Sequence, residues 1–161
     1  MIHNVYVPAG GDIPDREVNV KFGQKLDYVA EMRDWGRAEP PVKAILVGDL
    51  NIAPREDDVW NHKSLLKIVS HTPVEAELLN DAREAGGWAD VTRNDVPAGP
   101  LFSWWSYRSP DWDAADKGRR LDHVWASPDI ANAAHSSRIL RPVRGWDQPS
   151  DHAPVFATFD L

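Results

Sequence analysis

The segment Gly48-Asp49-Leu50-Asn51 places a carboxylate and a carboxamide two residues apart, directly after an aliphatic run typical of a strand buried on both faces. In an extended chain, residues i and i+2 point to the same side, so Asp49 and Asn51 could converge at the edge of a sheet. The carboxylate could act as a base or a hard metal ligand, and the amide could orient it. The alternative is a simple turn, because Asp and Asn are both favoured where a strand ends.

Two further acidic positions stand next to histidines. Asp151 and His152 precede the last apolar run, where His152 could donate to a phosphate oxygen and Asp151 could ligate a metal or orient a neighbour. A structural or solvated pair is the alternative. Asp122 lies inside the otherwise apolar segment Arg120-Leu121-Asp122-His123-Val124-Trp125 and needs a partner, for which a histidine on an adjacent strand would be suitable. A salt bridge to Arg119 or Arg120 is the alternative.

The aromatic segment from Phe102 to Arg108 contains two adjacent tryptophans. We assign Phe102 and Trp105 to the core, where aromatic side chains of this density usually lie. An exposed indole could instead form the wall of a pocket for a splayed sugar or base, with Arg108 nearby.

The pattern of apolar residues and turn signals predicts a layered α/β fold. Strands are expected at 2–7, 42–47, 101–107, 120–126, 137–143 and 153–159, and helices at 20–37, 62–72 and 73–86. A short link is expected at 88–91 and a surface loop at 109–118. The strands alternate with helices early in the chain and follow one another closely later.

The composition is that of one globular domain spanning residues 1–161, with 42% hydrophobic residues and eight Trp. The formal net charge of −7 argues against a protein that coats nucleic acid through bulk positive charge. With no cysteine, disulfides and thiolate metal sites are excluded. We expect a cytoplasmic protein that does not associate with membranes, because no signal peptide or long apolar stretch is evident.

The motifs Gly-Asp-x-Asn, Ser-Trp-Trp-x-Tyr-Arg, Arg-Leu-Asp-His and Ser-Asp-His-x-Pro-Val occur in this order along nearly the whole chain. In order and content they resemble those of the endonuclease/exonuclease/phosphatase superfamily, in particular its exonuclease III and abasic-site (AP) endonuclease branch. The resemblance implies part of a four-layer α/β sandwich, DNase I-like, with two β-sheets flanked by helices. The inositol-phosphatase branch carries a Trp-Cys-Asp-Arg motif, which a chain without cysteine lacks.

The resemblance also implies roles for individual residues. Asp49 resembles the acid that activates the attacking water, with Asn51 as its orienting neighbour, and Asp122 and His152 resemble the pair that contacts the scissile phosphate. Tyr6 resembles the active-site tyrosine of the family's Asn-Gly-Tyr-x-Pro segment, although Val5 replaces the glycine. The predicted metal ligands for Mg²⁺ or Mn²⁺ are Asp49, Asn51, Asp151 and His152. The predicted substrate-binding residues are Trp104, Arg108 and Arg120, with Lys117 and Arg119 as further candidates for holding phosphates.

Family members carry an Asn-bearing strand and a Gln-Glu segment, whose Glu is the principal metal ligand, before the tyrosine motif. Tyr6 stands near the start of this sequence, so we expect this N-terminal portion, roughly 100 residues, to be missing. A sandwich lacking most of one sheet would expose the inner face of the other, which a partner protein, self-association or a truncated gene model would each explain.

The sequence therefore predicts a divalent-metal-dependent phosphodiesterase acting on double-stranded DNA at abasic sites and 3′ ends, as a 3′–5′ exodeoxyribonuclease and AP endonuclease. One alternative is a phosphatase of the same fold acting on a small phosphoester. Another is a catalytically impaired fragment that acts only through binding, because the expected metal-binding Glu has no counterpart.

Overall fold

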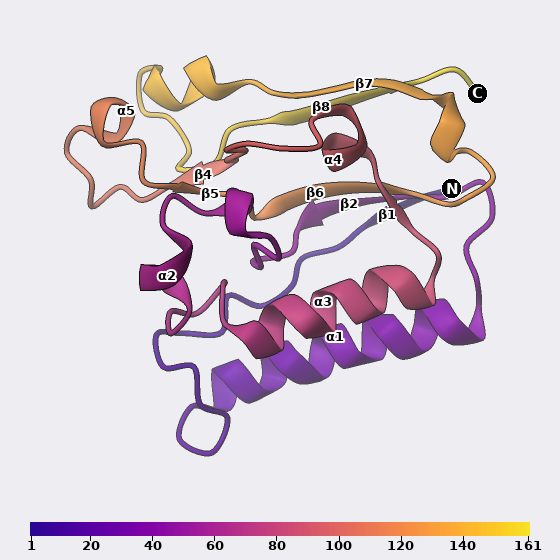
Figure 1. Cartoon of the computed structure of the whole chain (residues 1–161), viewed down its shortest axis with the longest axis horizontal. Coiled ribbons are helices and arrows are strands. Elements are labelled where there is room, and N and C mark those ends of the chain that lie inside the picture. Colours follow the sequence, from indigo (N-terminus) through magenta and orange to yellow (C-terminus); the bar gives the residue numbers. More distant parts are fainter.

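The computed structural model describes all 161 residues, and Figure 1 shows the order of the elements along the chain. The strands are β1 (Ile2–Asn4), β2 (Ile45–Asp49), β3 (Ala89–Asp90), β4 (Trp104–Trp105), β5 (Gly118–Arg119), β6 (Asp122–Ala126), β7 (Ala134–Ile139) and β8 (Val155–Phe159). The α-helices are α1 (Val20–Ala38), α2 (His62–Leu65), α3 (Pro73–Ala85), α4 (Val91–Asp95) and α5 (Trp112–Ala115). Short 3-10 helices cover Glu56–Asp58, Ala131–Ala133 and Arg141–Gly145.

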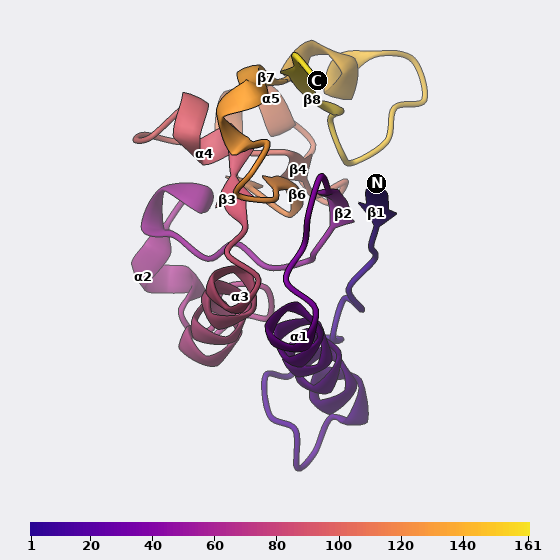
Figure 2. The same cartoon turned by 90° about the vertical axis from the view of Figure 1, so that its right-hand side faces the viewer.

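The central sheet has the strand order β1-β2-β6-β3. Strand β1 runs parallel to β2, whereas β6 is antiparallel to both of its neighbours. Helices α1 and α3 lie side by side on one face of this sheet, and the two-stranded sheet β7–β8 lies on the other (Figures 1 and 2). The β4–β5 pair lies next to the beginning of β6 (Figure 1). The predicted α/β architecture is confirmed, and the strands form three sheets, one of four strands and two of two strands.

Helix α1 begins where the sequence pattern placed it, after Asn19. The side-chain oxygen of Asn19 accepts a hydrogen bond from the Lys21 N–H at 3.1 Å, and its amide nitrogen donates to the carbonyls of Gly10 and Ile13. These bonds fix the loop before the helix as well as its first turn. Neither α1 nor any other helix of the chain combines the length and apolar character needed to cross a membrane.

A buried ion pair joins the two long helices to the loop that follows β2. Lys25 on α1 and Glu75 on α3 are both fully buried, and Lys25 Nζ lies 2.5 Å from a Glu75 carboxylate oxygen. Glu75 also closes a capping box with Thr72, which starts α3. Lys25 Nζ further donates to the carbonyl of Asn51 at 2.8 Å. The position of Asn51 therefore depends on the packing of both helices.

The main apolar core lies between the central sheet and the two helices. Its fully or nearly fully buried members are Val7, Val29, Ala44, Leu46, Leu50, Ile52, Leu79, Ala82, Trp88 and Trp125. On the opposite face of the sheet, Val124 and Ala126 of β6 pack with residues of β8 and α4. Alternate residues of β6 thus enter different cores, as expected for a strand buried on both faces.

Several predicted elements are shorter than expected. The strand predicted at 101–107 is reduced to β4, and the helix predicted at 62–72 is reduced to α2. The predicted loop 109–118 contains α5, and the predicted link 88–91 supplies β3. The strand predicted at 137–143 starts earlier, as β7, and gives way to a 3-10 helix with a proline in its first turn.

His71 lies below the loop after β2 and is almost completely buried. Its Nδ1 lies 2.6 Å from the Ala53 carbonyl oxygen, and its Nε2 lies 2.8 Å from Nδ1 of His62. Burial lowers the pKa of His71 below its ordinary value of 6.5; the hydrogen bond to Ala53 partly offsets this effect, and the charge of His62 adds to it. The folded protein therefore favours the neutral form of His71.

We predict that this depressed pKa makes the protein less stable as the pH falls below about 6.5. The unfolded chain then takes up a proton at His71 that the folded chain does not, so the stabilisation is complete above this pH and is lost below it. Thermal denaturation at about pH 7.5 and about pH 5.5 measures the effect. The decrease in melting temperature should be smaller for His71→Gln than for the wild-type chain, and equal decreases would contradict the prediction.

Candidate active site

The ends of two neighbouring strands bring two carboxylates together. In the antiparallel pairing of β2 with β6, Asp49 lies directly opposite Asp122. Residues in such a pair have Cβ atoms about 4.5–5.5 Å apart. A backbone bridge to Trp104 of β4 fixes the segment that carries His152, and His152 lies next to the two carboxylates. Ligand atoms of Asp49, Asp122 and His152 all lie within 4.8 Å of one another.

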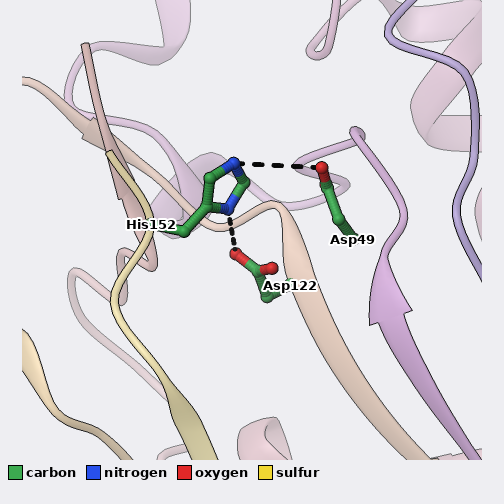
Figure 3. Close-up of side chains that lie close together, drawn as sticks. All are labelled: Asp49, Asp122 and His152. Carbon is green, nitrogen blue, oxygen red and sulfur yellow. Dashed lines mark hydrogen bonds and ion pairs between the residues drawn. The ribbon is translucent and has the colours of Figure 1, made fainter. Parts of the chain in front are cut away.

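The imidazole of His152 lies between the two carboxylates (Figure 3). Its Nδ1 is 2.8 Å from Oδ2 of Asp122, and its Nε2 is 3.9 Å from Oδ2 of Asp49. Burial by itself would lower the pKa of His152, but the hydrogen bond to Asp122 and the charges of the surrounding carboxylates outweigh it and raise the pKa. The site therefore favours the imidazolium form.

Ser103 supports Asp122 from behind, a role that the sequence did not suggest. This fully buried residue donates from Oγ to Oδ2 of Asp122 at 2.6 Å. Ser103 Oγ also accepts hydrogen bonds from the backbone N–H groups of Leu121 and Asp122, both at 3.0 Å. The carboxylate that holds His152 is consequently fixed to two strands, β4 through the adjoining Ser103 and β6 through its own backbone.

Asp49 and Asn51 converge as predicted, although the backbone between them is not extended. Asn51 has a φ of 51°, and it turns back so that its backbone N–H and its Nδ2 donate to the two carboxylate oxygens of Asp49 at 2.9 and 3.0 Å. Nδ2 also donates to the Val7 carbonyl at 2.9 Å. The sequence suggested either a simple turn or an orienting role for Asn51. Both are present, because the turn is what brings the Asn51 N–H groups to the carboxylate of Asp49.

The surroundings of Asp49 raise the pKa of its carboxyl group. Burial is the main cause that raises the pKa of Asp49, the Asn51 hydrogen bond opposes it, and the negative charge of Asp122 raises it further. Two carboxylates this close provide hard oxygen ligands and a local excess of negative charge. With the imidazole of His152, this donor set is compatible with a divalent cation.

A cleft of about 920 Å³ opens beside this group. Its lining includes the predicted residues Tyr6, Asp49, Asn51, Trp104, Arg108, Asp151 and His152. Tyr6 is 64% exposed, so its hydroxyl is accessible to a molecule in the cleft. The backbone pairing of β1 continues beyond its last residue through Val5 and Val7, and this pairing carries Tyr6 to the end of β2. The structure thus brings together residues separated by most of the sequence.

Asp151 lies on the cleft but outside the three-residue group. Its Oδ2 accepts a hydrogen bond from Nε1 of Trp104 at 2.9 Å, which fixes the indole against the wall of the cleft. Trp104 is only partly buried, whereas its neighbour Trp105 is 2% exposed, as expected of a core residue. The role of Asp151 as a metal ligand stays a prediction.

The prediction that Arg120 holds a substrate phosphate was wrong. Arg120 is fully buried, and its guanidinium forms bidentate contacts with both Asp58 and Asp90 at 2.8–3.1 Å. Arg93 pairs with the same Asp58 at 2.6 Å. Four of the five guanidinium N–H donors are used in these contacts, and Arg120 does not line the cleft that holds Asp49 and His152. The suggested salt bridge between Arg120 and Asp122 is also wrong, because Asp122 is bound by His152 and Ser103.

Comparisons with known proteins agree with this arrangement. The sequence profile described as "Endonuclease/Exonuclease/phosphatase family" matches residues 9–152. The chain belongs to this family. The matched range includes the strand ends that carry Asp49 and Asp122 and extends to His152. Family membership therefore rests on the same segments that build the three-residue group.

Individual family members are similar over almost the whole chain. Exodeoxyribonuclease III of Haemophilus influenzae is 29% identical over 97% of this chain and 60% of its own length. Among solved structures, an AP endonuclease from Archaeoglobus fulgidus has a TM-score of 0.91 at 26% identity. A 3′ phosphatase from Neisseria bound to product DNA hairpin has a TM-score of 0.89 at 30% identity. Each alignment covers 99% of this chain and 61% of the solved chain. The chain spans about three fifths of the length of these relatives.

We predict that Ser103→Ala lowers the free energy of unfolding by about 1–3 kcal/mol. The change removes the acceptor of two backbone N–H groups and the donor to Asp122, and the alanine cannot replace either. Urea denaturation of the variant and the wild type measures the loss. Ser136→Ala, on an exposed position of β7, is the matched control and should change stability little. Equal stability of the two variants would show that Ser103 does not hold this strand end.

Proposed function

We propose that the chain carries the catalytic carboxylate, its orienting amide and the phosphate-contacting histidine of a divalent-metal-dependent DNA phosphodiesterase of the exonuclease III type. The observation that carries this proposal is the arrangement of His152 between Asp49 and Asp122 at a cleft with an aromatic wall. The names of the similar family members, exodeoxyribonuclease III and AP endonuclease, support DNA as the substrate. The cytoplasmic location expected from the sequence remains a prediction.

In the proposed reaction, Asp49 accepts the proton of the attacking water. The two hydrogen bonds from Asn51 fix the orientation of the carboxylate, and burial raises its pKa toward that of a more effective base. Asp122 fixes the tautomer and orientation of His152 by accepting from Nδ1, which leaves Nε2 facing Asp49. From there, Nε2–H donates to a phosphate oxygen as negative charge develops on it.

Mg²⁺ or Mn²⁺ is the proposed cofactor. Asp49 is common to the predicted ligand set and to the observed group, while Asn51 and Asp151, which line the same cleft, remain predicted ligands. His152, the fourth predicted ligand, has only Nε2 free because Asp122 occupies Nδ1, and in the proposed reaction that nitrogen donates to the phosphate instead of binding the ion. When bound, the ion would withdraw electron density from the phosphate and neutralise part of the developing charge.

The proposed substrates are abasic sites and 3′ ends of double-stranded DNA. Trp104 offers a flat apolar surface to a sugar or base at the cleft wall, and Tyr6 and Arg108 lie on the same cleft. A phosphomonoester at a DNA 3′ end is a second candidate substrate, favoured by the similarity to the Neisseria 3′ phosphatase. A small phosphoester unrelated to DNA, and a binding role without turnover, are the outcomes that the following assay distinguishes.

We predict that the purified chain with Mg²⁺ cleaves an abasic-site duplex or trims its 3′ end, and that Asp49→Asn reduces the rate by about 100-fold or more. The substitution preserves the shape of the side chain but removes the base. Asp27→Asn, on the exposed surface of α1, is the matched control and should leave the rate unchanged. The proposal fails if cleavage by the wild-type chain does not exceed that by Asp49→Asn.

A further inference from the structure

Arg119 on β5 is a cation without a carboxylate partner at the wall of the cleft. Its Nη1 donates to the Val69 carbonyl at 3.1 Å and to Ser70 Oγ at 2.7 Å. Its Nε is buried and has no hydrogen-bond partner. The residue as a whole is only partly buried, and it lines the same cleft as Asp49 and His152. Nη1 is therefore fixed to the protein and Nε is enclosed, whereas Nη2 makes no hydrogen bond within the chain and is left for a molecule in the cleft.

Two other buried cations of the chain are paired with carboxylates. Lys25 pairs with Glu75, and Arg120 pairs with Asp58. Arg119 instead bears the cost of burial without an ion pair: desolvation lowers the pKa of its guanidinium, and the only opposing influence is the charge of Glu75. A partly desolvated cation of this kind is stabilised by an anion that enters its surroundings.

The neighbours of Arg119 connect it to the proposed catalytic group. Its guanidinium carbon lies 5.3 Å from the centre of the Trp104 ring, within the range of a cation–π interaction. Strand β4 pairs Trp104 with Arg119 on one side and with His152 on the other. Trp104 therefore lies between the two, and an anion at Arg119 would be adjacent to, but distinct from, a phosphate at His152.

A second cation continues this wall. Lys117 lies two residues before Arg119 in the chain, just outside β5, and both residues line the cleft. Gly118 between them faces inward, where a Cβ atom would lie 2.6 Å from Phe102. Lys117 Nζ lies 4.9 Å from the centre of the Trp60 ring, and both residues line the cleft. The wall thus presents two cation–aromatic pairs in succession.

We propose that Arg119, with Lys117 next to it, forms a second anion site that takes a phosphate of the DNA strand next to the phosphate held at Asp49, Asp122 and His152. The identity of the ligand rests on the proposed function. The site would favour a polynucleotide over an isolated phosphomonoester, because only the former places a second phosphate within reach. Trp104 would then separate the two phosphate sites, with the sugar or base between them against its ring.

The test is the salt dependence of binding of the intact chain to a short DNA duplex, measured by fluorescence anisotropy with EDTA present so that cleavage does not interfere. Each lost phosphate contact lowers the slope of log K against log salt by about 0.9 for duplex DNA. We expect Arg119→Gln to lower the slope by about this amount and to weaken binding about tenfold. Arg37→Gln, at the exposed end of α1, is the control and should leave both quantities unchanged.

Arg119→Lys guards against a folding defect, because it keeps the charge while losing the guanidinium fork. This variant should retain most of the wild-type slope, and melting curves confirm that each variant is folded. The inference is overturned if the wild-type chain does not bind the duplex, or if a folded Arg119→Gln has the wild-type slope. If Arg119→Gln lowers the slope but Asp49→Asn cleaves DNA as fast as the wild type, the anion site stands and the nuclease proposal fails.

Discussion

The antiparallel register between β2 and β6 is the constraint on which the site depends. It places Asp49, which lines the cleft, directly opposite Asp122. A shift by one residue would turn every side chain of one strand to the other face and remove one carboxylate from the group. Gly48 permits the close approach of the neighbouring chain, because it has a φ of 145° and a Cβ there would lie 1.8 Å from the Val5 carbonyl oxygen. The backbone that carries Tyr6 can therefore lie directly against β2.

Two ionic networks on other faces support this register without belonging to the site. The pair of Lys25 and Glu75 holds the loop that contains Asn51, and the contacts of Arg120 with Asp58 and Asp90 hold the entry to β6. Such buried charges are weak evidence for added stability, since their desolvation offsets much of the attraction. Their value here is positional: removing one partner would leave an unpaired buried charge beneath the site.

The sequence predicted the chemistry of the site better than its geometry. Asp49, Asn51 and His152 were recognised because their motifs occur in a characteristic order, and the structure does bring them to one cleft. The left-handed turn at Asn51 could not be read from the spacing alone, because an extended chain would also place the two side chains on one side. Ser103 was missed because a serine between aromatic residues gives no sign of which backbone groups it will meet.

Arg119 and Arg120 show the same limit most clearly. They are adjacent and chemically identical, yet one lines the cleft and the other is buried against Asp58, which lies 62 positions earlier in the chain. Successive residues of an extended chain point to opposite faces, so the register determines the face that each arginine occupies. The charged residues that it meets on that face are determined by long-range packing. Short elements such as β4 and α5 were mispredicted for a related reason, since contacts distant in sequence rather than local propensity determine them.

The central claim is that Asp49, Asp122 and His152 act as one group that handles a divalent cation and a phosphate. Titration with Mn²⁺ followed by NMR tests this most directly, because the paramagnetic ion broadens the signals of nearby residues. We expect the backbone signals around these three residues to broaden first, although the residues are far apart in sequence. The claim would be contradicted if broadening began instead at the exposed acidic segment 111–116 and left the signals around Asp49 sharp.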